Sequence, residues 1–255
     1  MRKRIILTLS CTALLAGCAS DSSSSSTGLY SDLMAKAKYR NLSAAAIFQK
    51  AKKAQDREDY SSAVTVYESL ESLYPYGPYA EQAQLNTAYC YYRRGESEAA
   101  EAAASHFIRL HPANPHVDYA WYLKGIAYYQ SIRGAEWNPR PLHSAFDTLE
   151  TVVKRWPNSA YAADARQRMA KIIDILGRRQ LDICRFYYIR HAYVAAANRC
   201  ESVVSKYQLS PSRQEALYYL TLSYRHLHMK KMASTTLAIL KHNYPKGSYT
   251  RDLQP

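Results

Sequence analysis

The chain has 255 residues, with 24 tyrosines, only 8 glycines and 10 prolines, and a formal net charge of +13. A chain of this length can bury a large core, and the low glycine and proline content argues against a loop-rich or all-β protein. The positive charge raises nucleic acid as a partner. However, the basic residues are scattered and no known nucleic-acid motif is present. We therefore expect acidic protein surfaces or anionic lipid headgroups, and no nucleic acid, as partners of this charge.

The N-terminus has the features of a secretion signal. Basic residues 2–4 precede the apolar run 5–15, which is too short to span a bilayer. The run ends in Leu-Ala-Gly-Cys, which is similar to a bacterial lipobox and implies removal of residues 1–17 and acylation of Cys18. In lipoproteins the next residue steers sorting, and Ala19 in place of aspartate implies the outer membrane. The alternative is an ordinary secretory peptide with an incidental cysteine.

Residues 18–40 are predicted to form a lipidated tether. The serine-rich part, 21–27, has nothing to bury and is expected to be flexible. Residues 29–40 are weakly amphipathic, so they are expected to pack on the first repeat or on a partner.

An alanine followed twelve residues later by a proline recurs along the rest of the chain. A small residue lets two antiparallel helices approach closely, and proline ends the second helix. A tetratricopeptide unit is a helix-turn-helix of about 34 residues with an A…F…P pattern. The sequence therefore predicts an all-α, tetratricopeptide-like solenoid of five helix-turn-helix repeats, with a generic helical bundle as the alternative. The copies are Ala63–Pro75, Ala100–Pro112 (with Gly95 in the turn), Ala145–Pro157, Ala196–Gln208 and Ala233–Pro245.

Repeats one to three are assigned to residues 41–157. Ser43 is expected to cap the first helix, and a turn is expected at 57–60. The third repeat contains an insertion, 132–141, whose exposed Trp137 makes it a candidate functional loop.

Residues 158–255 are predicted to hold one extra helix, 160–176, followed by repeats four and five. The first helix of repeat four is expected to be a separate element carrying Cys184. The tail after Lys246 is expected to be frayed.

Tyrosines and one arginine occupy positions that face the concave groove in tetratricopeptide arrays. A tyrosine buries a large ring and keeps a hydroxyl for hydrogen bonding, which suits a groove that holds peptide. The alternative is that several of these rings belong to the core between repeats. The candidate peptide-binding residues are Tyr74, Tyr76, Tyr79, Leu85, Tyr89, Tyr92, Arg93 and Tyr122.

Catalytic and metal-binding constellations are not found in the sequence. It has no nucleophile elbow, phosphate-binding loop or paired CxxC, and His226 and His228 point to different faces of a helix. We expect neither an enzyme nor a cofactor beyond the covalent lipid on Cys18. Cys90, Cys184 and Cys200 leave at least one unpaired thiol. Cys184 and Cys200 lie on helices that should pack together, and we expect buried thiols there in preference to a disulfide.

Three short motifs are similar to those of a known family. Y-P-Y-G-P-Y at 74–79, F-I-R-L at 107–110 and N-R at 198–199 resemble the BamD (ComL) family, lipoproteins of the machinery that assembles β-barrels in Gram-negative outer membranes. The resemblance implies five repeats, no enzymatic activity, and a lipid anchor at the periplasmic face of the outer membrane. It also implies that the N-terminal repeats bind targeting signals of unfolded outer-membrane β-barrel precursors. The C-terminal repeats would dock the periplasmic domain of BamA, alongside other Bam lipoproteins.

The resemblance assigns the docking role to Asn198 and Arg199. An arginine presents an always-charged, bidentate fork that suits a carboxylate on a partner, and the alternative is an ion pair within the repeat. The chain departs from the family in its shorter 132–141 insertion and in Gln208-Leu209 at the end of repeat four. A tetratricopeptide lipoprotein adaptor for cell-wall enzymes or secretin assembly is the alternative function.

Overall fold

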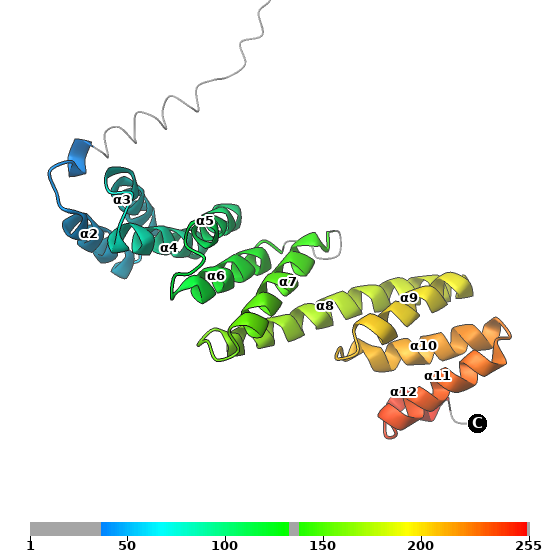
Figure 1. Ribbon diagram of the computed structural model, residues 1–255. Helices are drawn as coiled ribbons and strands as arrows, with labels where there is room; N and C mark the ends of the chain where they lie inside the picture. Colours follow the sequence, from blue (N-terminus) through cyan, green and yellow to red (C-terminus); the bar gives the residue numbers. More distant parts are fainter. Residues whose placement is uncertain (1–36, 133–137, 254–255) are drawn as a thin grey trace, which may run out of the picture.

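Paired antiparallel helices make up the fold. The computed structural model describes residues 37–132 and 138–253, and within these ranges the chain forms helices and no strands. Consecutive helices pack side by side, and the pairs stack into an elongated array (Figure 1). The predicted all-α, tetratricopeptide-like solenoid is confirmed. The helices are α2 (Ala44–Asp56), α3 (Tyr60–Leu73), α4 (Pro78–Arg93), α5 (Ser97–Leu110), α6 (Val117–Gln130), α7 (Arg140–Arg155), α8 (Ala162–Ile189), α9 (Tyr193–Lys206), α10 (Ser212–His226), α11 (Lys230–Asn243) and α12 (Ser248–Asp252).

The recurring alanine is buried in every repeat. Its side chain is fully buried in four copies and 6 % exposed in the fifth, Ala233. The second helix ends two residues before the proline position, where the next backbone N–H donates to the carbonyl four residues earlier. Helix α9 ends in the same way, with Tyr207 N–H donating to Val203, although the proline is replaced by Gln208. The end of the second helix therefore does not depend on proline alone.

The predicted cap and turn of repeat one are confirmed. Ser43 Oγ accepts a hydrogen bond from the N–H of Ala46 at 3.3 Å, and so satisfies one of the free donors at the start of α2. The turn between Asp56 and Tyr60 falls within the predicted 57–60 segment.

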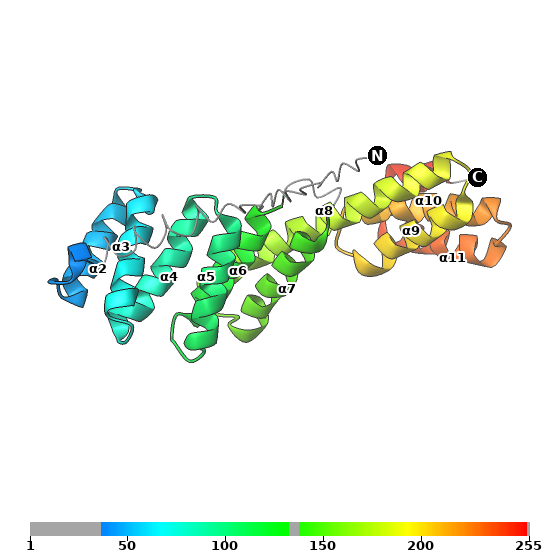
Figure 2. The same ribbon diagram turned by 90° about the horizontal axis from the view of Figure 1, so that it is seen from above.

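Helix α8 corrects the expected boundary between the extra helix and repeat four. The two predicted helices are one continuous helix of 28 residues. Its first half, through Ile172 and Leu176, packs into the core shared by α4 to α7, whereas Leu181 and Cys184 pack into the core of α9 and α10. Figure 2 shows α8 running from the N-terminal row of helices to the C-terminal group. One helix therefore belongs to both halves and fixes their relative position.

Two further expectations are wrong. The tail after Lys246 is not frayed: α12 follows it, and Thr250 and Leu253 are 1 % and 5 % exposed. Cys184 and Cys200 are not thiols but a disulfide, with their Cα atoms 5.4 Å apart. Small residues at the crossing of α8 and α9 bring the two helices close enough for the bond, whereas Cys90 remains a buried free cysteine.

Candidate binding surfaces

The first helices of neighbouring repeats contact one another and form the inner wall of the N-terminal half. Tyr119 and Tyr122 of α6 pack against Tyr161, just before α8, with ring centroids 4.8 and 5.0 Å from it. The Tyr122 hydroxyl donates a 2.6 Å hydrogen bond to Asp164, which also accepts one from Arg168 Nε. Tyr122 is therefore half-buried and already hydrogen-bonded within the fold.

The hydrogen bonds of this network favour a neutral Tyr122 hydroxyl and an ionised Asp164 carboxylate. Burial raises the pKa of the Tyr122 hydroxyl to about 12, and the hydrogen bond to Asp164 acts in the same direction. Burial alone would raise the pKa of Asp164, but the hydrogen bonds from Tyr122 and Arg168 hold that pKa below its usual value. The carboxylate is thus ionised at neutral pH and holds α6 against α8.

Arg93 is held in a second cluster between α2, α3 and α4. Its guanidinium lies 4.7 Å from the centre of the Tyr60 ring and donates to the Tyr89 hydroxyl at 2.6 Å. It also forms a 3.3 Å ion pair with Glu58, whose side chain is 73 % exposed. Arg93 is thus already paired with a carboxylate. Its partner Glu58 is at the surface, where an ion pair contributes little to stability.

The three tyrosines of residues 74–79, between α3 and the start of α4, have different surroundings. Tyr74 is partly buried, and its hydroxyl donates to the carbonyl of Leu42 at 2.7 Å. Tyr79 packs near Phe48 with ring centroids 5.5 Å apart. Tyr76 is 92 % exposed. Within this turn, Tyr76 is the ring most available to a partner.

The predicted peptide-binding residues therefore occupy several places. Leu85 is 8 % exposed and lies in the core, and Tyr92 is partly buried against the same core. Tyr89 and Arg93 belong to the Tyr60 cluster, Tyr122 belongs to the Asp164 network, and the remaining three lie at the α3–α4 turn.

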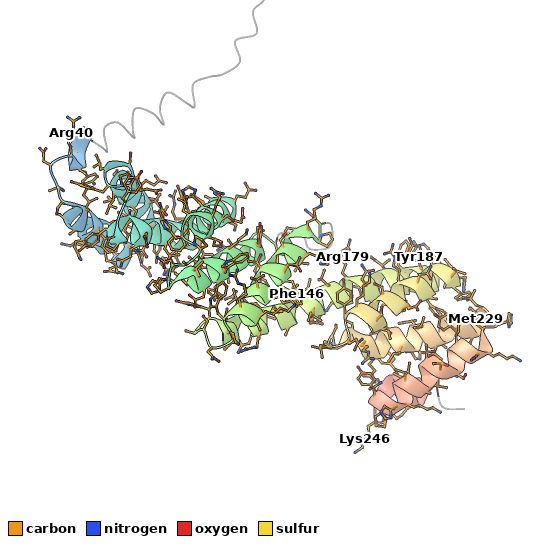
Figure 3. The ribbon with its side chains drawn as sticks, viewed as in Figure 1. Arg40, Phe146, Arg179, Tyr187, Met229 and Lys246 are labelled. Atoms are coloured by element: carbon orange, nitrogen blue, oxygen red, sulfur yellow. A yellow bond between two sulfur atoms is a disulfide. The ribbon has the colours of Figure 1, made fainter. Side chains whose placement is uncertain are left out.

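Arg199 and Asn198 are both exposed on α9, beside a small hollow where α9 meets α8. The hollow has a volume of about 230 Å³ and is lined by Tyr187, Ala195, Asn198 and Arg199. Tyr187 lies near the C-terminal end of α8 (Figure 3). The Arg199 guanidinium makes no hydrogen bond or ion pair with any residue in the described ranges. The alternative of an ion pair within the repeat is thus not found there, and we call this place the Arg199 hollow.

A wider apolar edge adjoins the Arg199 hollow at the α8–α9 and α10–α11 turns. Tyr193 stacks on His226 with ring centroids 4.2 Å apart, which brings the two turns together. A depression of about 490 Å³ runs beside them, lined in part by Val194, Asn198 and Leu227. Ile189 and Val194 are 70 % and 61 % exposed, and Met229 marks the outer end of this edge (Figure 3). The edge therefore offers apolar contact area next to a free cation.

Comparison with known proteins decides the family. Residues 40–240 match the family described as YfiO, outer membrane lipoprotein. The chain belongs to this family. A relative from Neisseria meningitidis serogroup B, named "Outer membrane protein assembly factor BamD", is 34 % identical over 259 residues, covering 98 % of this chain and 94 % of its own. The BamD protein of Pasteurella multocida is 32 % identical over 72 % of this chain and 75 % of its own. Among solved structures, the MamA protein covers 80 % of this chain and 92 % of its own at 15 % identity, with a TM-score of 0.41.

Several sequence-based predictions concern residues outside the described ranges. These are the signal peptide 1–17, the lipidation site Cys18, most of the tether 18–40 and Trp137 of the insertion. Among the residues that the structure does describe, no helix is long and apolar enough to cross a membrane, and no cluster of histidine, cysteine and acidic side chains could hold a metal ion.

Sequence reasoning missed two parts of these surfaces. Asp164 and Arg168 are one helical turn apart, a spacing typical of an ion pair, but only the fold shows that Tyr122 joins them. The apolar edge could not be found from the sequence, because Ile189 and Val194 are of residue types that are usually buried.

Proposed function

We propose that the chain is a non-catalytic, lipid-anchored scaffold for outer-membrane protein assembly, held at the periplasmic face of the outer membrane by acylated Cys18. Its N-terminal half binds unfolded β-barrel precursors, and its C-terminal half docks the periplasmic domain of BamA, together with other Bam lipoproteins. The observation that carries the proposal is the family match over residues 40–240, because this range includes both candidate surfaces. The names of the relatives, all assembly factors of outer membrane proteins, support the same role.

The docking half of the proposal rests on the chemistry of the Arg199 hollow. An arginine without an internal partner is available to a carboxylate of another chain, and its planar fork can bind both carboxylate oxygens. The adjoining apolar edge supplies contacts that exclude water from such an ion pair and so increase its contribution to binding. BamA would therefore place an acidic side chain in the hollow and apolar side chains along the edge.

Changing Arg199→Glu tests the docking site. We expect the affinity for the BamA periplasmic domain to fall by about 2–5 kcal/mol, because the acidic partner would then face a like charge. Lys241→Glu on α11 is the matched control: it makes the same change in charge away from the hollow and should cost far less. Affinity is measured by titration calorimetry, and thermal unfolding shows whether the variant stays folded. Equal losses for the two variants, or unfolding of Arg199→Glu, would refute the docking role.

The client half of the proposal rests on Tyr76 and on the exposed partner of Arg93. Tyr76 precedes α4 and Arg93 ends it, so the two lie about 25 Å apart along the helix axis. A peptide that ends in an aromatic residue with a free carboxylate would displace Glu58 from Arg93, and residues nearer its N-terminus would contact Tyr76. Tyr76→Ala should weaken peptide binding by about 1–3 kcal/mol without changing the fold, since the ring is almost fully exposed.

Glu58→Gln gives the sharper test of the carboxylate. Removing the charge of Glu58 frees Arg93, so a peptide with a free C-terminus should bind up to about fivefold tighter, which matches the small value of an exposed ion pair. The same peptide with an amidated C-terminus should bind the variant and the original chain equally. If amidation makes no difference to either protein, Arg93 does not receive the carboxylate. Capture of envelope proteins by the lipidated chain separates the roles, since an adaptor would recover cell-wall hydrolases or secretin in place of BamA.

A further inference from the structure

The two half-cystines belong to the two helices that line the Arg199 hollow. Tyr187, one wall, is three residues after Cys184 on α8, and Arg199, the other wall, directly precedes Cys200 on α9. Because the walls come from two different helices, the shape of the hollow depends on how α9 is placed against α8. The disulfide is the covalent link between these two helices.

Helix α9 has less apolar bulk to hold it than the second helices of other repeats. Each of the other second helices buries at least one larger apolar side chain: Tyr67 in α3, Phe107 in α5, Leu149 in α7 and Leu240 in α11. The buried side chains of α9 are Ala196, Ala197, Cys200 and Val203, none larger than valine. The disulfide therefore takes the place of a large packed side chain in repeat four.

The middle of α9 is held by small side chains packed against α10 and by the disulfide to α8. Arg185, next to Cys184, donates from Nε to Glu215 of α10 at 2.6 Å, and the Glu215 side chain is only 13 % exposed, so α8 is fixed from the other side. The first turn of α9 is held separately by the stacking of Tyr193 on His226. Cleaving the disulfide should therefore loosen the segment around Arg199 while the fold persists.

We propose that the Cys184–Cys200 disulfide is a positioning element for partner docking, which keeps Arg199 and Tyr187 at the separation that the partner recognises. The inference rests on the proposed function for the partner that fills the hollow. Disulfides persist in oxidising compartments. Because the bond positions Arg199 in this proposal, docking through the hollow requires the oxidised chain. Dithiothreitol reverses the bond by two thiol–disulfide exchanges. The Sγ–Sγ bond breaks, each sulfur gains one electron and one proton, and the two thiols of the reagent become its cyclic disulfide.

Hydrogen exchange on the full-length chain in detergent tests the structural part. We compare the oxidised chain, the chain in dithiothreitol and the Cys184→Ser/Cys200→Ser variant. Amides of α9 should exchange on the order of tenfold faster once the disulfide is lost, while those of α11 stay unchanged. A Cys184→Ala/Cys200→Leu variant restores a large side chain without the bond. It distinguishes local loosening of α9 from general unfolding of the chain. Unchanged exchange in α9 would overturn the proposal.

Binding of the BamA periplasmic domain tests the functional part. The affinity should fall on the order of tenfold in the reduced chain and in the Cys184→Ser/Cys200→Ser variant, and Arg199→Glu should cost less in that variant than in the oxidised chain. A Cys90→Ala variant controls for effects of the reagent on the remaining thiol. Faster exchange in α9 with unchanged affinity would also overturn the proposal. If even the oxidised chain does not bind BamA, the proposed partner is wrong, and the exchange measurement still decides whether the disulfide positions α9.

Discussion

A single residue in the left-handed region joins the two helices in four of the repeats. It lies five positions before the recurring alanine, as Glu58, Gly95, His191 and His228, with φ angles of 60°, 79°, 61° and 57°. For residues with a Cβ this conformation is unfavourable by roughly 1–2 kcal/mol. Sequence reasoning identified only Gly95, because glycine is the residue type that marks such turns. The other three residues adopt this conformation because of their position in the turn of the repeat, and their residue types do not predict it.

Reciprocal substitutions test this turn geometry. Gly95→Ala should lower the free energy of unfolding by about 1 kcal/mol, and the cause is confined to the backbone because nothing lies within 4 Å of the added Cβ. His228→Gly should raise it by up to about 1 kcal/mol. Urea unfolding measures both. His242→Gly, on an exposed helical position of α11, is the control and should destabilise by about 0.3–0.5 kcal/mol, the difference in helix propensity between histidine and glycine. A loss of stability for His228→Gly as large as that of the control would contradict the prediction.

Among the elements, α8 shows where a local pattern misleads. The sequence predicts an extra helix over 160–176, which ends directly before Gly177, a residue type that lowers helix propensity. In the fold the helix continues, and a Cβ on Gly177 would lie 2.6 Å from Ser210 Oγ and 2.8 Å from its Cβ. The absence of a side chain at Gly177 thus allows the α9–α10 connection to approach α8 closely. A contact between residues so far apart in sequence cannot be found from a helix pattern, and neither can the disulfide.

Gly177→Ala therefore has an expected outcome opposite to helix propensity. Alanine should gain about 1 kcal/mol as a helix former, but the clash with Ser210 should outweigh this, for a net loss of about 1–2 kcal/mol. Ser210→Gly removes the clashing atoms, so the double variant should be more stable than the two single effects predict. Thermal unfolding of the four proteins gives the coupling energy. Additive effects would show that the approach of Ser210 does not explain the glycine.

At the scale of the whole molecule, the charge is divided unequally between the halves. Residues 18–157 contain 15 basic and 15 acidic residues, whereas residues 158–255 contain 16 basic and 6 acidic residues. Four of those six acids, Asp164, Asp174, Asp182 and Glu215, are already paired with arginines. The net charge of residues 18–255 thus comes from the half that contains the Arg199 hollow. The overall charge predicts acidic partners, and its division between the two halves places the attraction for such partners in the C-terminal half, where docking is proposed.

This division predicts that the two halves respond differently to salt. Uncompensated charge speeds the association of an oppositely charged partner, and salt screens it over about 10 Å at 0.1 M and 3 Å at 1 M. Association of the proposed acidic partner, the BamA periplasmic domain, should therefore slow by roughly tenfold or more between 0.05 and 0.5 M salt, with a smaller change in dissociation. Peptide binding at the neutral N-terminal half should change little. Surface plasmon resonance gives both rates, and Lys241→Glu/Lys246→Glu, which leaves the hollow intact, should reduce the salt dependence of docking. Equal salt dependence for docking and peptide binding would show that the charge of the C-terminal half does not guide the partner.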